Sequence, residues 1–400
     1  MSIAYESLLE RERKVVCQTY GRYPLAVARA KGARLWDLDG REYVDLLAGI
    51  SVANLGHSRP ELTEVMLAQA GKLVQVSNLF LQEEQVVLAE KLTKTCGLAN
   101  AFFFNSGAEA NEAAIKLARR YMRRVRGREA YGIVTLSGSF HGRTLATLTA
   151  TGQEGKIKDG FGPLPEGFAT VPFGDVAALR SAVTESTAAV LVEMVQGEGG
   201  VRPLPADYAE ALAALCRERG VLLIADEVQT GLCRTGKFWA HEHFGLAPDI
   251  LTTAKALANG LPMGAMLACE EVARGFEPGT HATTFGGGGV VSAVAAKVVD
   301  ILLAEDLAGR AARLGRLALD EAAKLAARHP GTIAQARGLG LMIGIELAFP
   351  GTKVWQAMLE AGFVLNLTQE RVLRLLPPLV IAEADLLAFF AALDRILART

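Results

Sequence analysis

The chain has 400 residues, half of them apolar and about a fifth charged. This composition can supply a large buried core, and the length favours more than one domain. The formal net charge is −1, which gives no electrostatic basis for binding nucleic acid or an anionic membrane. Five scattered cysteines form no CxxC pair, so we expect no disulfide framework and no metal site.

The N-terminal residues carry charges early and show no apolar signal core. Because no uninterrupted apolar run reaches the roughly 18 residues of a membrane span, we expect a soluble cytoplasmic protein without membrane contacts. The first predicted elements are two strands over 34–37 and 42–45, which flank Leu38-Asp39-Gly40-Arg41 as a β-hairpin.

Short apolar runs alternate with helix-like segments between about residues 100 and 270. The runs predict buried strands, and the intervening Ala-rich stretches 109–124 and 207–219 predict amphipathic helices. Such alternation indicates an α/β fold with a mostly parallel sheet that helices cover on both faces. The predicted strands are 101–104, 132–136, 188–193, 221–226, 250–253 and 264–268.

After about residue 295 we expect two long helices, a strand over 342–347 and a final helix over 382–398. The sequence therefore predicts a smaller α+β part built from both chain ends against a large central α/β domain. We place the N-terminal part of the small domain at 1–50, the large domain at 51–295 and the C-terminal part at 296–400.

An acid and a lysine stand out at the ends of two predicted strands. Asp226, with Glu227 beside it, ends the run 221–226, and Lys255 directly follows the run 250–253. Pyridoxal phosphate chemistry needs an acid that keeps the pyridine nitrogen protonated and a lysine that holds the cofactor and moves a proton. The alternative is a surface acid and a helix lysine in an ordinary α/β protein.

Asn105-Ser106-Gly107-Ala108-Glu109 joins a predicted strand to a strong helix. A helix that begins after such a loop presents free backbone N–H groups, which suit a phosphate. The alternative is an ordinary capped helix start, with Ser106 as N-cap and Glu109 three residues later. His241 and His243 are separated by one residue and have no further ligands nearby in the sequence, so we do not predict a metal there.

Two further loops follow predicted strands. Phe140 could stack on a planar ring, and Arg143 could bind a carboxylate through two hydrogen bonds. Glu193 and Glu198 lie in a glycine-rich loop, where the backbone can approach a ligand closely. A core phenylalanine, a surface arginine and solvated acids are the alternatives.

The order of these motifs along the chain resembles the class III (ornithine-type) pyridoxal-phosphate aminotransferases, and most of all their acetylornithine branch. The resemblance covers about residue 20 to the last helix. It rests on NSGAEANEAAIKLAR, FHGRT, VQGEGGV, LLIADEVQTGLCRTG, PDILTTAKAL, GTHATTFGG and VLRLLPPLVI. It implies the fold of the type I pyridoxal-phosphate enzymes and a homodimer whose active sites lie at the subunit interface.

Residue roles follow from the resemblance alone. It implies that Lys255 holds the cofactor and that Asp226 binds the pyridine nitrogen. It also implies a carboxylate clamp at Arg143, with Thr283 nearby, and a second clamp at Arg374 that Glu198 neutralises. The implied cofactor contacts are Ser106, Gly107, Ala108, Phe140, Glu227, Val228, Gln229 and, from the other subunit, Thr284.

The activity that the resemblance implies is transfer of the terminal amino group of N2-acetylornithine to 2-oxoglutarate. The products would be N-acetylglutamate semialdehyde and glutamate, in arginine biosynthesis. Other donors remain open: succinylornithine, N-succinyl-diaminopimelate, a carrier-linked lysine precursor, ornithine and 4-aminobutyrate. A pyridoxal-phosphate aminomutase, which needs no 2-oxoglutarate, is the alternative reaction. We expect residues such as 51–54 to build the pocket that selects the donor.

The chain departs from the family pattern at three places. Met194 replaces the usual proline of the EPxQGEGG loop, and Cys233 stands within the loop that usually reads GVGRTG. Gly286-Gly287-Gly288-Gly289 replaces the usual GGNP. Because glycine has more backbone freedom to lose, we expect the segment after Thr284 to be more mobile, and cofactor affinity to depend strongly on the dimer.

Overall fold

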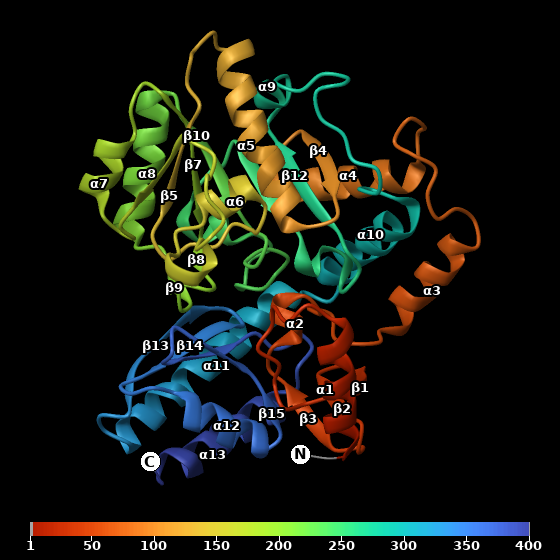
Figure 1. Ribbon diagram of the computed structural model, residues 1–400, viewed down its shortest axis with the longest axis vertical. Coiled ribbons are helices and arrows are strands. Elements are labelled where there is room, and N and C mark those ends of the chain that lie inside the picture. The colour runs from red at the N-terminus through yellow and green to blue at the C-terminus, as the bar shows by residue number, and fades with distance from the viewer. Residues whose placement is uncertain (1–2, 400) are drawn as a thin grey trace.

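A computed structural model describes residues 3–399, which form a large upper body and a smaller lower body (Figure 1). The upper body contains a seven-stranded sheet with helices on both sides. The lower body brings the first strands of the chain beside its last helices. The predicted α/β fold and the smaller part assembled from both chain ends are confirmed.

The large sheet has the order β4-β12-β11-β10-β7-β5-β6. All neighbouring strands from β11 to β6 are parallel, whereas β12 runs antiparallel to both β11 and β4. Its strands are β4 (Asn100–Phe104), β5 (Gly132–Leu136), β6 (Phe168–Val171), β7 (Thr187–Glu193), β10 (Leu222–Asp226), β11 (Ile250–Thr253) and β12 (Gly264–Ala268).

The central strands of this sheet are buried along their whole length, as their apolar runs require. Helix α5 (Gly107–Arg124) packs its Ala-rich face on β11 and β12. The other helices of this region are α3 (Pro60–Ala70), α4 (Glu83–Cys96), α6 (Leu145–Ala150), α7 (Val176–Ala182), α8 (Ala206–Arg219) and α9 (Glu270–Ala273). Short 3-10 turns are η1 (Gly155–Ile157), η2 (Ala240–Phe244) and η3 (Lys255–Ala258), and β8 (Val195–Gln196) pairs with β9 (Arg202–Pro203).

Two four-stranded sheets form the lower body. The first has the order β1-β2-β3-β15, so a strand from near the C-terminus pairs with the N-terminal hairpin. The second has the order β13-β14-β17-β16. The strands are β1 (Val27–Lys31), β2 (Arg34–Asp37), β3 (Glu42–Asp45), β13 (Ile333–Leu339), β14 (Met342–Leu347), β15 (Phe363–Val364), β16 (Asn366–Thr368) and β17 (Val372–Leu375).

The remaining helices are α1 (Ile3–Val15), α2 (Ala48–Ser51), α10 (Gly289–Ala304), α11 (Leu307–Arg328), α12 (Thr352–Glu360) and α13 (Glu383–Leu397). The boundaries that we predict after residues 50 and 295 fall inside α2 and α10, and the division into domains stays a proposal. Across residues 3–399, none of the helices is both long and apolar enough for a membrane span.

Candidate active site

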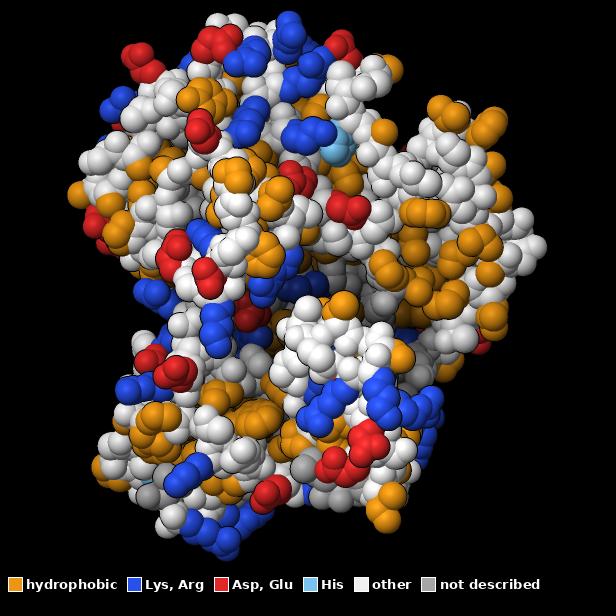
Figure 2. All heavy atoms as spheres, viewed as in Figure 1, with side chains coloured by type: hydrophobic (Ala, Val, Ile, Leu, Met, Phe, Trp, Pro, Cys, Tyr) orange, Lys and Arg blue, Asp and Glu red, His pale blue; other side chains and the backbone are white. Residues whose placement is uncertain are grey.

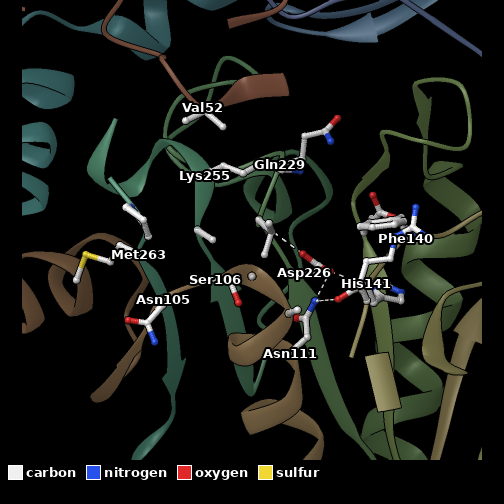
Figure 3. Close-up of a pocket in the computed structure, with 18 of the residues that line it drawn as sticks. Val52, Asn105, Ser106, Asn111, Phe140, His141, Asp226, Gln229, Lys255 and Met263 are labelled. Carbon is white, nitrogen blue, oxygen red and sulfur yellow. Dashed lines mark hydrogen bonds and ion pairs between the residues drawn. The ribbon is translucent and has the colours of Figure 1, made fainter. Parts of the chain in front are cut away.

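A cavity of about 400 Å³ opens beyond the carboxyl ends of β7 and β10, where parallel α/β sheets collect ligands. It brings together most of the predicted site residues from segments that are far apart in the sequence (Figure 3). Those that line it are Ser106, Gly107, Ala108, Phe140, Arg143, Glu198, Asp226, Val228, Gln229 and Lys255. Val52, Asn105, Asn111, His141, Glu193 and the segment 260–263 complete the lining.

Asp226 is held by a network of buried partners. Its Oδ2 accepts a hydrogen bond from Asn111 Nδ2 and shares another with His141 Nδ1, both at 2.8 Å. Its Oδ1 accepts from the backbone N–H of Val228 at 3.0 Å. Asn111 Oδ1 in turn accepts from the Thr252 hydroxyl, so the side chain of Asp226 has one available orientation. Figure 3 shows this cluster on one side of the cavity.

Asn111 and His141 are site residues to which the sequence analysis gave no role. Asn111 lies on α5, four residues after Gly107, and is fully buried among alanines. A polar side chain at a buried helical position is a signal that could have been used, because such groups need partners. His141 directly follows Phe140, and its Nε2 has no partner among the described residues.

Glu193 ends β7 and pairs in register with Asp226 on β10. Its two carboxylate oxygens accept hydrogen bonds from the backbone N–H groups of Phe140, at 2.8 Å, and Gly197, at 3.2 Å. Burial raises the pKa of Glu193 to about 7. The neighbouring charge of Asp226 adds to this shift, and His141 opposes it.

We predict that Glu193→Gln removes a pH dependence of stability. The folded state retains the proton of Glu193 up to about pH 7, whereas the ordinary pKa is 4.5. Glu193 therefore contributes to the free energy of unfolding in full below pH 4.5, and this contribution is lost as the pH rises through 7. The loss is about 3 kcal/mol. Urea unfolding of the cofactor-free protein between pH 4.5 and 8 measures it. Wild type and Glu193→Gln should diverge across this range; parallel curves would contradict the prediction. Exposed Glu129→Gln is the control.

Lys255 follows β11 and begins η3 with a backbone φ of 43°. A lysine in this left-handed region is strained, and such strain is concentrated at functional sites. Burial lowers the pKa of Lys255, while the charges of Glu198 and Asp226 oppose that shift. The amine is therefore easier to deprotonate than that of a solvated lysine, which suits a group that accepts a proton.

The first turn of α5 opens on the cavity. Ser106 caps this helix, because its hydroxyl accepts from the backbone N–H of Glu109, so the capped start that stood as the alternative is present. The N–H groups of Gly107 and Ala108 have no hydrogen-bond partner in the described part of the chain. A helix N-terminus with two free N–H groups suits an anion such as phosphate.

Arg143 and Phe140 lie together on the loop after β5. The Arg143 guanidinium lies 5.4 Å from the centre of the Phe140 ring. Arg143 is exposed to solvent and forms no ion pair within residues 3–399. It therefore has its hydrogen-bond donors available for a carboxylate.

Arg374 lies on β17 and is buried, with 1 % of its surface exposed. Its Nη1 donates to Glu198 Oε1 at 2.6 Å, and its Nη2 donates to Asn366 Oδ1 at 2.7 Å. Glu198 lines the cavity, whereas Arg374 does not. The ion pair that the resemblance implies between these two residues is present in the structure.

Glu227 lies outside the cavity, although we expected it among the cofactor contacts. Its carboxylate accepts hydrogen bonds from Thr230 and from the backbone N–H groups of Ala240 and His241, and it is bonded to the His241 ring. Adjacent residues at a strand end point in different directions, and Asp226 alone turns toward the cavity.

The expectation that residues 51–54 line the donor pocket holds only for Val52. The Ser51 hydroxyl donates to the Gln229 carbonyl, and Asn54 Nδ2 donates to the Leu232 carbonyl. Both side chains also accept from Arg234. The side chains of Ser51 and Asn54 therefore form hydrogen bonds inside the protein, and the expectation that they contact the donor is wrong.

Thr283 and Thr284 do not line this cavity either. Their carbonyls accept hydrogen bonds from Asn78 and Gln75, which attach their loop to the segment that follows α3. Thr284 is exposed on the surface of this chain. This position is compatible with a contribution to the site of another subunit.

The lining of the cavity fits pyridoxal phosphate. Phosphate would bind the free N–H groups of Gly107 and Ala108, and the ring would lie on Phe140. The buried Oε1 of Gln229 has no partner among residues 3–399, which leaves it available for a ring hydroxyl. Asp226 would bind the ring nitrogen, and Lys255 would hold the cofactor; both line the cavity.

Comparison with known proteins agrees with this chemistry. Residues 15–397 match the family model described as aminotransferase class-III. The chain is 44 % identical to the acetylornithine aminotransferase of Methanocaldococcus jannaschii, covering 98 % of each, and 45 % identical to that of Myxococcus xanthus, covering 95 % of each.

Solved structures give the same result. The ornithine aminotransferase of Toxoplasma gondii superimposes with a TM-score of 0.95 at 33 % identity, covering 99 % of this chain and 95 % of the other. The acetylornithine aminotransferase of Elizabethkingia anophelis gives a TM-score of 0.88 at 33 % identity, covering 99 % of each. The family that the sequence resembles is confirmed: the chain belongs to the class III aminotransferases and is a pyridoxal-phosphate-dependent enzyme.

Proposed function

We propose that this enzyme transfers the terminal amino group of N2-acetylornithine to 2-oxoglutarate, and so forms N-acetylglutamate semialdehyde and glutamate in arginine biosynthesis. Relatives named acetylornithine aminotransferase at 44–46 % identity support this donor. The observation that carries the proposal is the arrangement of two arginines: Arg143 is free beside the cavity, and Arg374 is paired with Glu198.

That arrangement suits two substrates with different charges. N-acetylornithine has one carboxylate, which Arg143 can bind while Glu198 stays paired with Arg374. 2-Oxoglutarate has two carboxylates, and the second can bind Arg374 once Glu198 releases it. Leaving a buried arginine unpaired would cost about 3–5 kcal/mol, so the exchange of one carboxylate for another avoids that cost.

The bound cofactor acts as an electron sink that makes a proton on the donor's amine-bearing carbon acidic. Lys255 Nζ would take that proton, and its lowered pKa leaves more of the amine free to accept it. Asn111 and Val228 donate hydrogen bonds that would hold the Asp226 side chain in place beside the ring nitrogen. Phe140 and Val228, which both line the cavity, would contact the ring.

One experiment tests this donor against the others. Steady-state kcat/KM is measured with 2-oxoglutarate and each of N-acetylornithine, succinylornithine, N-succinyl-diaminopimelate, a carrier-linked lysine precursor, ornithine and 4-aminobutyrate. We expect N-acetylornithine to have the highest value. Preference for another amine would overturn the donor and keep the class. Repeated turnover without 2-oxoglutarate, beyond a single conversion of the bound cofactor, would indicate an aminomutase.

We also propose a homodimer with shared active sites in the cytoplasm. An apolar surface lies at the right of Figure 2, over α3 and the loop after it. Leu79 is 89 % exposed and Leu81 98 % exposed, and the Thr283–Thr284 loop is attached to the same segment. So large an exposed apolar surface is typical of a subunit interface. All five cysteines are free, which suits a reducing compartment.

The glycine run provides a test of the link between the dimer and the cofactor. Gly288 is the N-cap of α10, with φ −57° and ψ 152°, and Gly289 is its first residue. Asparagine is favoured at an N-cap and proline at the first helical position, and this φ/ψ is also allowed before proline. We therefore predict that Gly288→Asn with Gly289→Pro stabilises the protein by about 1 kcal/mol and slows cofactor dissociation.

Thermal unfolding and the rate of cofactor loss from the diluted dimer measure these effects. A Cβ at Gly289 would lie 3.0 Å from Gln69 Nε2 and 3.1 Å from the Leu73 carbonyl, so these neighbours must move slightly. Gly21→Ala is the control, because Gly21 has open space around it and no contact with this loop. An unchanged rate of cofactor loss in the double variant would contradict the link.

A further inference from the structure

Arg234 is a fully buried arginine whose hydrogen bonds join separate parts of the molecule. Its Nε donates to Ser51 Oγ at 2.9 Å, and its Nη2 donates to Asn54 Oδ1. Its Nη1 donates to the carbonyls of Leu341, at 2.9 Å, and Pro377, at 2.7 Å. Within residues 3–399 it forms no ion pair with an acid.

The segments that Arg234 joins carry groups of the active site. Ser51 precedes Val52, which lines the cavity, and the Ser51 hydroxyl also donates to the carbonyl of Gln229 at 3.1 Å. Pro377 follows Arg374 by three residues, in the loop after β17. Arg234 itself lies in the loop that begins after Asp226. One guanidinium therefore connects the loop of the cofactor-binding residues with the segment that carries Val52 and with the segment that follows Arg374.

The segment before Val52 needs such support. Ala48, Gly49, Ile50 and Ser51 have φ values of 50°, 64°, 65° and 63°, which makes a turn of left-handed helix. This conformation costs roughly 1–2 kcal/mol for each residue other than glycine, and it persists only where surrounding contacts impose it. The bond from Arg234 to Ser51 is one of those contacts.

Stability alone is a poor explanation for this arginine. A charge buried without an acid gains little net stability, and an apolar side chain of similar volume often serves as well. A guanidinium offers several donors in a rigid plane, so it holds the oxygens around it at set distances from one another.

We propose that Arg234 is a positioning residue, which sets Val52 and Arg374 relative to Asp226 and Gln229 and thereby controls how well the site binds a dicarboxylate substrate. The proposal rests on the proposed function, in which Arg374 binds the second carboxylate of 2-oxoglutarate. It assigns to Arg234 no contact with substrate or cofactor.

The test compares Arg234→Lys with the control Arg310→Lys. Arg310 lies on α11 and also donates to carbonyls after β17, those of Leu379 and Ile381, but it is remote from the cavity lining. For cofactor-loaded Arg234→Lys we expect KM for 2-oxoglutarate to rise about tenfold, with kcat and the cofactor absorbance little changed. Arg310→Lys should lower the melting temperature without changing KM.

Binding of glutarate, a dicarboxylate without a reacting group, is measured by calorimetry as a readout independent of turnover. It should weaken in Arg234→Lys by the same factor as KM rises. Ser51→Ala keeps the arginine and removes one acceptor, so it should weaken glutarate binding about threefold even if Arg234→Lys does not fold.

Failure of the role of Arg234 and failure of the proposed function give different results. If wild type binds glutarate and both variants bind it within twofold of wild type, the role of Arg234 is overturned while the proposed function stands. If wild type itself binds neither glutarate nor 2-oxoglutarate, the dicarboxylate acceptor is overturned, and the role of Arg234 with it.

Discussion

Replacement of Lys255 by alanine should abolish amino transfer and leave the fold intact. Lys255 lines the cavity and is the group placed to move the proton, so its loss removes general acid–base catalysis worth up to about 10⁴-fold, as well as the attachment of the cofactor. Alanine has the same Cβ as lysine at φ 43°, so the backbone strain is unchanged, while a buried amine is removed; no large loss of stability is expected. Turnover with N-acetylornithine and 2-oxoglutarate, and thermal unfolding, measure the two effects.

The control for this prediction is Lys353→Ala. Lys353 is exposed on α12, so its loss should change neither turnover nor stability. A Lys255→Ala enzyme with turnover within tenfold of wild type would refute the role of Lys255. Retained turnover would also show that amino transfer does not take place in this cavity.

Replacement of Asp226 by asparagine should reduce catalysis far more than it reduces cofactor binding. Asparagine keeps the shape but loses the charge that would hold a proton on the ring nitrogen. In addition, its amide donor would face Asn111 or His141, which lie 2.8 Å from Oδ2. We expect kcat to fall on the order of 10³-fold, which is about 4 kcal/mol, while the phosphate contacts at Gly107 and Ala108 retain the cofactor.

Asp249→Asn is the matched control for Asp226→Asn. Asp249 is a largely buried acid immediately before β11, and its Oδ2 accepts from the backbone N–H of Leu223. It therefore lies at the opposite end of the same strands from the cavity. This variant should lose some stability and keep its kcat. Equal losses of kcat in both variants would show that Asp226 acts only through the fold.

The large sheet could be predicted almost completely from the sequence, because its strands are continuous apolar runs. Six of its seven strands were predicted, and β6 was missed. β6 has four residues, lies at the edge of the sheet and is half exposed, so its sequence lacks the apolar run of a buried strand. The N-terminal hairpin was predicted from its turn, but its pairing with β15 depends on contacts across more than 300 residues.

The candidate site could be predicted wherever a residue ends a strand or begins a helix. Asp226, Lys255 and Ser106 are such residues, and parallel strands bring their ends together. The direction of a neighbouring side chain could not be predicted: Glu227 turns away from the cavity, and the left-handed turn directs Ser51 inward. Arg234 could not be assigned either, because its partners come from three distant segments.

One site should take an amino group from N-acetylornithine and give it to 2-oxoglutarate. This is tested when the cofactor-loaded enzyme is mixed with N-acetylornithine alone and the cofactor absorbance is followed. We predict complete conversion to the aminated cofactor, followed by full recovery of the original absorbance when 2-oxoglutarate is added. Conversion only by a different amine, or no recovery with 2-oxoglutarate, would contradict the account.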